Sequence, residues 1–229
     1  MKQSMLVCAA GLLLLLLWAM PFRCFASETW TVLVDDEFDT ALDQDVWRIY
    51  RNSRGGEVLV TDGQLRILDV DPGSRQLGIM LSHPIDLTGK TTAIEIAYVE
   101  AGHSEQNPGF WNDPTVENAD VWFSPGFRLT VYPTGFETIS IAAGDAWFDP
   151  ESAYEMVYPA TLTWIITHRK GDLFDVTVLV DGVEAYSGEL HLASVDPTSV
   201  YFYFYISNAD EHDLVTAVER ITIRQEPRR

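Results

Sequence analysis

Hydrophobic side chains alternate with other side chains at every second position along much of this chain, and that period limits what it can fold into. In the segment 200–206, phenylalanines and tyrosines take alternate positions. Side chains of a β-strand point alternately to the two faces of a sheet, whereas an amphipathic helix repeats about every 3.6 residues. The period therefore predicts strands. Similar alternation is found in the segments 92–99, 127–132, 137–143, 161–169 and 217–224.

Two Asp-Gly pairs predict tight turns between such strands. Asp62-Gly63 separates the segments 57–61 and 64–68, and Asp181-Gly182 separates 174–180 from 183–187. Both residues of a two-residue hairpin turn need positive φ, which Asp and Gly adopt more readily than most residues. We therefore expect two antiparallel hairpins.

The stretch 102–120 lacks this alternation and contains Asn107-Pro108-Gly109. We expect a long loop there, and loops of that length are often functional. No segment combines a helical period with helix caps. About a dozen short strands joined by polar turns predict an all-β protein, an antiparallel two-sheet sandwich of jelly-roll type.

The first 26 residues differ from the rest. Lys2 precedes an apolar run over residues 5–22, and the segment ends on Cys24-Phe25-Ala26. A basic start, an apolar middle and small residues before the exit are typical of a secretory signal peptide. We expect a signal peptide at 1–26 and one β-sandwich domain at 27–229. The alternative is an uncleaved membrane anchor, which needs about 20 apolar residues.

Removing this leader makes the net charge of the chain more negative. The leader holds two of the 15 basic residues, none of the 34 acidic ones and both cysteines, so the remaining 203 residues carry a net charge of −21 (13 − 34) and no thiol. Such a chain repels phosphate and anionic lipid headgroups, which argues against nucleic acid and membrane partners once the leader is cleaved. We expect a location outside the cytoplasm: secreted, periplasmic or at the cell surface.

Three separated segments, in this order, resemble one known superfamily. They are 34–47, with Asp36-Glu37-Phe38 and a later Leu42-Asp43 and Trp47; the hairpin 58–67; and the closing segment 218–224. The order is similar to that of the concanavalin A-like lectin/glucanase superfamily, in particular laminarinase- and lichenase-type glycosidases and laminin-G-like modules. The resemblance implies two curved sheets, one of them concave and open to ligand, and a last strand that returns beside the first.

The carboxylate pair of a glycosidase is not evident in the sequence. A retaining glycosidase needs two carboxylates about 5–5.5 Å apart. In the glycosidases that the chain resembles, they lie on a central strand that would correspond to 127–132, but the outward positions there are Arg128, Thr130 and Tyr132. Glu95 and Glu100 are an odd number of residues apart, so a regular strand would send them to opposite faces. We therefore assign no catalytic residue.

The three tyrosines of segment 200–206 are the strongest binding candidates. Tyr201, Tyr203 and Tyr205 lie opposite Phe202 and Phe204, so we expect an exposed row with Tyr203 at its centre. Sugar rings stack on such aromatic faces. Tyr203→Ala should then weaken binding and leave the fold intact. The alternative is that these rings only stabilise the outer sheet through cross-strand pairs.

Further ligand-binding candidates come from parity and from the loops. Arg128 and Tyr132 have the same outward parity on their strand, and Trp111 and Trp122 lie in or beside the long loop. Arg supplies five N–H donors for sugar hydroxyls or for a uronate carboxylate. Trp30, Trp47 and Trp164 are expected in the core.

The resemblance also implies a structural calcium ion remote from the open face. In the glucanases it is held by two backbone carbonyls and an acidic side chain, which correspond here to Glu37, Gly63 and Glu219. Calcium prefers oxygen ligands of this kind. Glu219 stands where the family usually has Asp.

We therefore expect a secreted, non-catalytic carbohydrate-binding module that uses the concave sheet face. One alternative is a glycosidase or polysaccharide lyase with an atypical site built from loop acids near Trp111. The other is an extracellular protein-binding module of laminin-G type.

Overall fold

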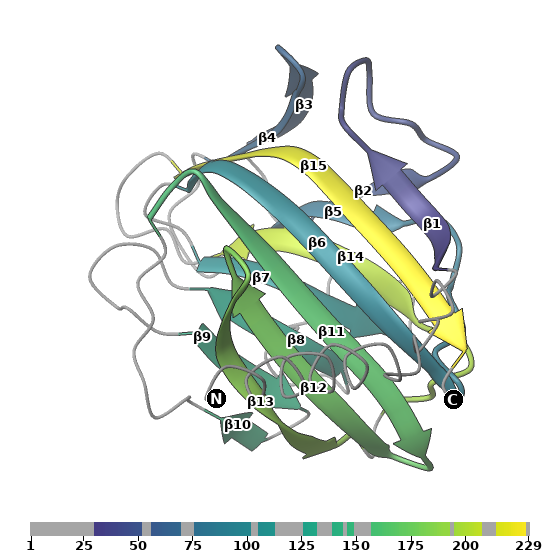
Figure 1. Ribbon diagram of the computed structural model, residues 1–229. Coiled ribbons are helices and arrows are strands. Elements are labelled where there is room, and N and C mark those ends of the chain that lie inside the picture. The colour runs from purple at the N-terminus through teal and green to yellow at the C-terminus, as the bar shows by residue number, and fades with distance from the viewer. Residues whose placement is uncertain are drawn as a thin grey trace, which may run out of the picture.

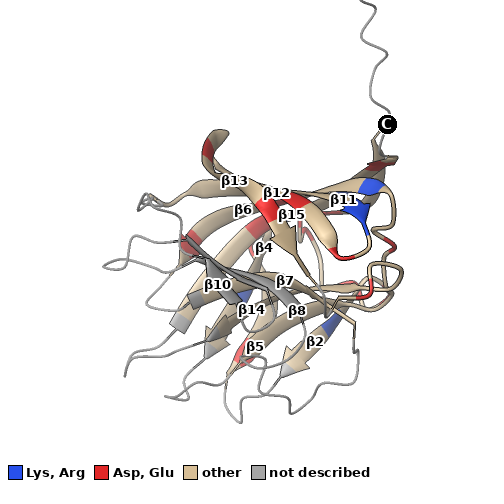
Figure 2. Ribbon diagram, turned by 90° about the horizontal axis from the view of Figure 1, so that it is seen from below, with Lys and Arg blue, Asp and Glu red and all other residues tan. Residues whose placement is uncertain are grey.

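The computed structural model describes residues 30–51, 56–69, 76–101, 105–112, 126–131, 139–143, 146–148, 157–192, 195–207 and 214–227. The secondary-structure elements of this part of the chain are all β-strands. It therefore has no helix that could cross a membrane. The strands form the two layers seen in Figures 1 and 2. Their bounds are β1 Thr31–Asp36, β2 Trp47–Arg51, β3 Glu57–Thr61, β4 Gln64–Asp69, β5 Leu77–Leu81, β6 Lys90–Ala101, β7 Glu105–Trp111, β8 Gly126–Val131, β9 Ile139–Ala143, β10 Ala146–Phe148, β11 Ala160–Lys170, β12 Leu173–Val180, β13 Val183–His191, β14 Tyr201–Ser207 and β15 Leu214–Pro227.

The two sheets are antiparallel throughout the described pairings. The first sheet has the order β13-β12-β11-β6-β15-β4-β3, with β1 also paired to β15. The second sheet has the order β10-β9-β8-β7-β14-β5-β2. Figure 1 shows β1 lying along β15. This pairing confirms that the closing strand returns beside the first, and the architecture confirms the predicted all-β two-sheet sandwich.

Alternating burial explains why these segments form strands. In β11, Leu162, Trp164 and Ile166 are buried, while the alternate positions, Thr161, Thr163, Ile165 and Thr167, are only partly buried. β12 has the same pattern in its pairing with β11. A period of two lets one face of each strand pack into the interior while the other faces out. Both expected hairpins are present: φ is 55° and 71° at Asp62 and Gly63, and 50° and 78° at Asp181 and Gly182.

The main core lies between the two sheets. Trp47 of β2 contacts Phe202 of β14 edge to face, with ring centroids 6.3 Å apart. Phe110 of β7 lies between Phe202 and Trp164, at 5.8 and 5.3 Å. Trp47 and Trp164 are fully buried, as expected, whereas Trp30 is only partly buried. The expectation for Trp30 is therefore wrong: it lies just before β1, and the neighbouring Val32 and Leu33 are exposed.

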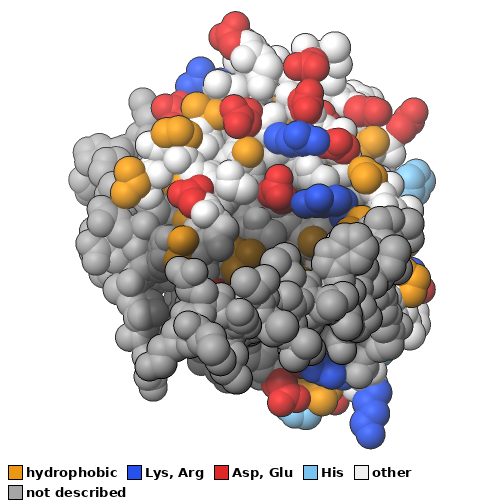
Figure 3. All heavy atoms as spheres, viewed as in Figure 1, with side chains coloured by type: hydrophobic (Ala, Val, Ile, Leu, Met, Phe, Trp, Pro, Cys, Tyr) orange, Lys and Arg blue, Asp and Glu red, His pale blue; other side chains and the backbone are white. Residues whose placement is uncertain are grey.

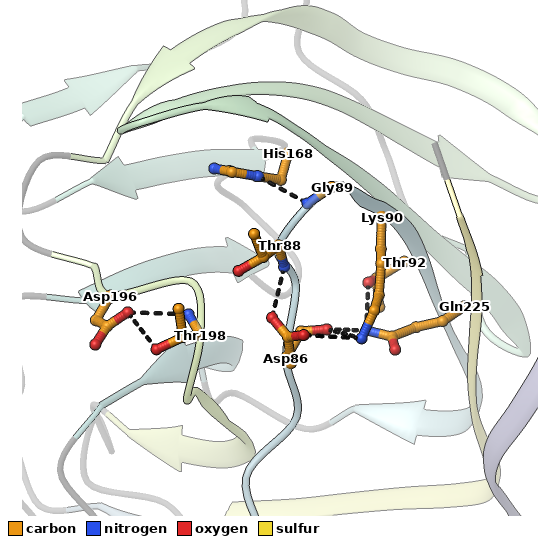
Figure 4. Close-up of polar contacts among 9 residues, drawn as sticks. All are labelled: Asp86, Thr88, Gly89, Lys90, Thr92, His168, Asp196, Thr198 and Gln225. Atoms are coloured by element: carbon orange, nitrogen blue, oxygen red, sulfur yellow. Dashed lines mark hydrogen bonds and ion pairs between the residues drawn. The ribbon is translucent and has the colours of Figure 1, made fainter. Parts of the chain in front are cut away.

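Polar contacts fix the connection between β5 and β6 at one end of the sandwich (Figure 4). The Gln225 amide donates to the carbonyl of Asp86 at 3.0 Å, and the Gly89 amide donates to Nδ1 of His168 at 2.9 Å. Burial would raise the pKa of Asp86, but hydrogen bonds from Thr88 and Lys90 outweigh it, so the pKa lies below its ordinary value. The last strand and β11 thereby anchor this loop.

The expectation of a long loop over residues 102–120 is wrong in part. Residues 105–111 form β7, which lies inside the second sheet between β14 and β8, and residues 106–111 are buried. Proline removes one backbone donor, so it is normally confined to edge strands. Pro108 nevertheless sits opposite Phe204 in a central strand.

Candidate functional site

A second hydrophobic cluster covers the outer face of the second sheet. It consists of Tyr50, Met80, Trp111, Tyr203 and Tyr205, with the partly buried Tyr201 packed against it. Because Phe202 and Phe204 point into the main core, the alternating Tyr201, Tyr203 and Tyr205 must point away from it. The predicted alternation of β14 is therefore confirmed. We call these six residues the outer cluster.

Strand register brings the outer cluster together. Tyr203 lies opposite Met80 of β5, Tyr201 lies opposite Trp111 of β7, and Tyr205 lies opposite Gly78, which in turn faces Tyr50 of β2. The rings of Tyr203 and Tyr205 stack at 5.4 Å, and Trp111 meets Tyr203 edge to face at 6.2 Å. A side chain at position 78 would collide with the backbone of β14, since a Cβ there would lie 2.0 Å from the carbonyl oxygen of Phe204.

The expectation that Tyr203 is the centre of an exposed row is wrong. Tyr203 and Tyr205 are 2% and 1% exposed. Rings and Met80 from four neighbouring strands pack against one another and account for part of this burial. The Tyr50 hydroxyl also donates to Oε1 of Gln76 at 2.6 Å, and both residues are buried. These rings form a packed layer rather than a free stacking surface.

The accessible part of this face centres on Tyr201 and Arg48, both of which are partly buried. Arg48 lies opposite Met80, and its guanidinium Cζ lies 5.3 Å from the centre of the Tyr201 ring. One of its terminal nitrogens donates to the Met80 sulfur at 2.9 Å. A cation thus lies directly beside the aromatic layer.

Two residues of this face, Arg48 and Tyr50, were missed by sequence reasoning. The signal was present, since Trp47, Arg48, Ile49 and Tyr50 alternate between the core side and the outer side. Ile49 is 48% exposed because β2 is the edge strand, so the alternation is incomplete there.

The remaining predicted ligand residues are only partly placed. Arg128 lies opposite Gly109, which lies opposite Tyr203, so the backbone of Arg128 belongs to the same cross-strand series. Its side chain, and the whole of Tyr132 and Trp122, lie outside the described residues. Trp111 joins the outer cluster, but as a strand residue that is 4% exposed rather than as a loop residue.

The three predicted calcium ligands belong to segments that meet along one edge of β15. That edge pairs with β4 as far as Val218 and with β1 from Ile221 onward. Glu219 lies between these two pairings, at an irregularity of the β15–β6 ladder. Glu37 directly follows β1, and Gly63 directly precedes β4. The topology suits the predicted donor set of two carbonyls and one carboxylate, and calcium binding there stays a prediction.

A side-chain cation already lies at this edge. The Arg220 guanidinium donates to both carboxylate oxygens of Asp35, at 2.8 and 2.9 Å, and approaches Glu37 at 3.4 Å. The hydrogen bond from Arg220 holds the pKa of Asp35 below its ordinary value. Within the described residues, no group of three or more acidic, His or Cys side chains could hold a metal ion. A calcium site here would therefore depend on backbone carbonyls.

Glu95 and Glu100, the two acids considered as a catalytic pair, take part in separate ion pairs on the first sheet. Glu95 binds Arg224 at 3.3 Å, and Glu100 binds Arg66 at 2.5 Å. Basic side chains lie among acidic ones in the described part of the face shown in Figure 3. Each of these carboxylates is therefore paired with an arginine of the first sheet.

The two antiparallel sheets and the return of the last strand beside the first define the fold. It is a lectin-like β-sandwich, the fold that the resemblance to the concanavalin A-like lectin/glucanase superfamily implies. No model of a known protein family matches the sequence, and a search of curated proteins found no match.

Solved structures agree on the fold. The chain is similar to a galectin-like protein of unknown function from Bacillus subtilis, with a TM-score of 0.61 and 13% identity over 88% of this chain and 100% of that one. Peanut lectin matches with a TM-score of 0.59 and 7% identity over 86% and 97%. A structure from work on endo-acting O-glycanases of the human gut microbiota that initiate mucin breakdown matches with 0.57 and 14% over 84% and 98%.

Proposed function

We propose that this protein is a non-catalytic carbohydrate-binding module that acts outside the cytoplasm. The observation that carries the proposal is the outer cluster with Arg48 and Tyr201 at its accessible edge. An aromatic layer with a small number of polar groups is the usual composition of a sugar site. The fold is shared with peanut lectin and with a structure from work on endo-acting O-glycanases that initiate mucin breakdown.

The site's centre differs from the one expected from the sequence. Tyr203 and Tyr205 are covered, so they act as the floor of the site and hold Tyr201 and Trp111 in place. The ring of Tyr201 and the N–H donors of Arg48 make the contacts with the sugar. A rigid aromatic floor lowers the entropy that the ligand-contacting side chains lose on binding.

We also propose that the module does not catalyse a reaction on the sugar. Positions on this face with described side chains carry no carboxylate, and hydrolysis with retention or inversion needs two. These positions are Arg48, Tyr50, Met80, Asn107, Trp111, Tyr201, Tyr203 and Tyr205, with glycines at 78 and 109.

A glycan array followed by calorimetry on the exported protein tests the binding. Tyr201→Ala should weaken binding by about 0.5–1.5 kcal/mol, the contribution of one aromatic contact. The matched control is Tyr186→Ala, which removes a partly buried tyrosine from β13 of the other sheet and should leave affinity unchanged. Equal loss in both variants, or no glycan binding at all, would contradict the proposal.

Enzyme assays on the bound glycans test the second part. We expect neither new reducing ends nor the unsaturated sugar ends that a lyase produces. Turnover of either kind would favour the glycosidase or lyase alternative, in keeping with the glycanase work among the structural matches. If no glycan binds, the protein-binding alternative becomes the leading one.

Export is part of the same proposal and has its own measurement. The basic start, the apolar run and the small residues before Ser27 support cleavage after Ala26. Mass spectrometry of exported protein should find an N-terminus at Ser27. Recovery of the apolar run in the membrane fraction would favour an anchor instead.

A further inference from the structure

Arg48 is the exception among the arginines whose side chains the structure describes. Arg66, Arg169, Arg220 and Arg224 each form an ion pair with a carboxylate of their own sheet region. Arg48 forms none, and its contacts are the Met80 sulfur and the Tyr201 ring. In a chain with 34 acidic and 15 basic residues, an arginine without an acidic partner is unexpected.

The contacts of Arg48 leave most of its hydrogen-bonding capacity unused. A guanidinium has five N–H donors, and a thioether sulfur is only a weak acceptor for one of them. The Tyr201 ring stabilises the cation through its π face without accepting a conventional hydrogen bond. Because Arg48 is only partly buried, its remaining donors can reach a ligand at the surface.

The same contacts hold the guanidinium in a defined position. Arg48 lies in the outer strand β2, directly opposite Met80, and Met80 lies opposite Tyr203. Met80 is 2% exposed, so the sulfur that accepts from Arg48 is itself fixed by packing. A positioned guanidinium fork matches the two oxygens of a carboxylate and loses little side-chain entropy on binding it.

We infer that Arg48 recognises the carboxylate of an acidic sugar, such as a uronic or sialic acid residue, while the aromatic face beside it receives the ring. This inference rests on the proposed function, because it names the sugar class that the same site takes. A carboxylate is preferred to a sulfated or phosphorylated ligand because the chain has a net charge of −19, which repels polyanions at long range. A single carboxylate adds only one negative charge, and the fixed guanidinium of Arg48 supplies one positive charge to bind it.

Calorimetry with matched ligand pairs tests the inference. The probes are two oligosaccharides, one with a single uronic acid residue and one with a single sialic acid residue, each compared with its own carboxyl-reduced neutral form. The protein should bind one acidic member about tenfold more tightly than its neutral partner, the effect of one charge-assisted contact. The preference should decline with added salt, because the contact lies at the surface.

Variants assign the preference to Arg48. Arg48→Gln should abolish it, and Arg48→Lys should retain only part, because an ammonium lacks the planar fork. Arg66→Gln is the matched control: it removes the same charge from the first sheet and should leave the preference intact. Melting curves of all three variants establish that they fold.

The outcomes separate the two proposals. Binding of neutral and acidic partners with equal affinity, or an unchanged preference in Arg48→Gln, would overturn the role of Arg48 and leave the carbohydrate-binding function standing. Failure to bind any glycan would overturn both.

Discussion

Tyr203 and Phe204 are neighbours in β14 whose side chains pack into different clusters. Phe204 is fully buried in the main core, where its ring meets Tyr98 at 5.9 Å, and Tyr203 is 2% exposed in the outer cluster. Phe204→Ala should lower the free energy of unfolding by about 3–5 kcal/mol, since it leaves a core cavity. Tyr203→Ala should also destabilise the protein by several kcal/mol, contrary to the expectation from sequence. Urea denaturation measures both, and an unchanged midpoint for Tyr203→Ala would mean that the outer cluster is not packed in solution.

The ion pair between Asp35 and Arg220 makes stability depend on pH in the acid range. Hydrogen bonding to Arg220 lowers the pKa of Asp35 below 3.8, its value in the unfolded chain. A lowered folded-state pKa stabilises the fold at all pH values above the unfolded pKa, and this contribution is lost as the pH falls from 3.8 through the folded value. The Asp35 side chain is 40% exposed, so solvent screening keeps the contribution small. In urea denaturation at a series of acid pH values, Asp35→Asn should reduce the pH dependence of the free energy of unfolding. The control Asp39→Asn, at an exposed position, should not change it.

At Gly78, strands β5 and β14 of the second sheet approach each other so closely that no side chain fits between them. A Cβ at this position would lie 2.0 Å from the Phe204 carbonyl oxygen and 2.5 Å from the Tyr205 Cα, so the backbones of β5 and β14 would have to separate. Gly78→Ala should destabilise the protein by about 3 kcal/mol or more, at the upper end of overpacking effects. Gly188→Ala is the control, because there the nearest atom is the movable Tyr186 hydroxyl. Similar melting temperatures for both variants would contradict this account.

Strands with alternating patterns and Asp-Gly turns were predictable from the sequence, but β7 and the burial of β14 were not. Asn107-Pro108-Gly109 has the composition of a turn, and only its neighbours β14 and β8 turn it into a central strand. Tertiary pairing outweighs local preference in such a segment. For β14 the signal was misinterpreted: residues 200–206 form an unbroken apolar and aromatic run, which is typical of a strand buried on both faces.

The candidate site was less predictable than the fold, because it depends on register. Tyr201 and Trp111 both lie in the outer cluster, yet Arg48 reaches them only through the pairing of β2 with β5 and of β5 with β14. No local pattern specifies which strands become neighbours when they are this far apart in the sequence.

At the scale of the whole molecule, the remaining prediction concerns calcium. An ion held where β1, β4 and β15 meet would stabilise the folded state by mass action, so the melting temperature should rise with calcium and fall with a chelator. Glu219→Gln should abolish the shift, and Glu226→Gln, at the far end of the same strand, should preserve it. If calcium and chelator leave the melting curve of the unaltered protein unchanged, the predicted calcium site is wrong, and the Asp35 and Glu37 carboxylates have Arg220 as their cation.

The position of β15 determines when this chain can fold during its synthesis. β15 is the last described strand, yet it lies inside the first sheet, with β6 on one side and β1 and β4 on the other, and its Gln225 pairs with Thr31 at the start of β1. A nascent chain therefore cannot close its first sheet until β15 has left the ribosome. Pairings between such distant segments also form slowly. The protein should thus stay open until β15 emerges, in a state that a chaperone or an export channel can accept, and become resistant to protease only then.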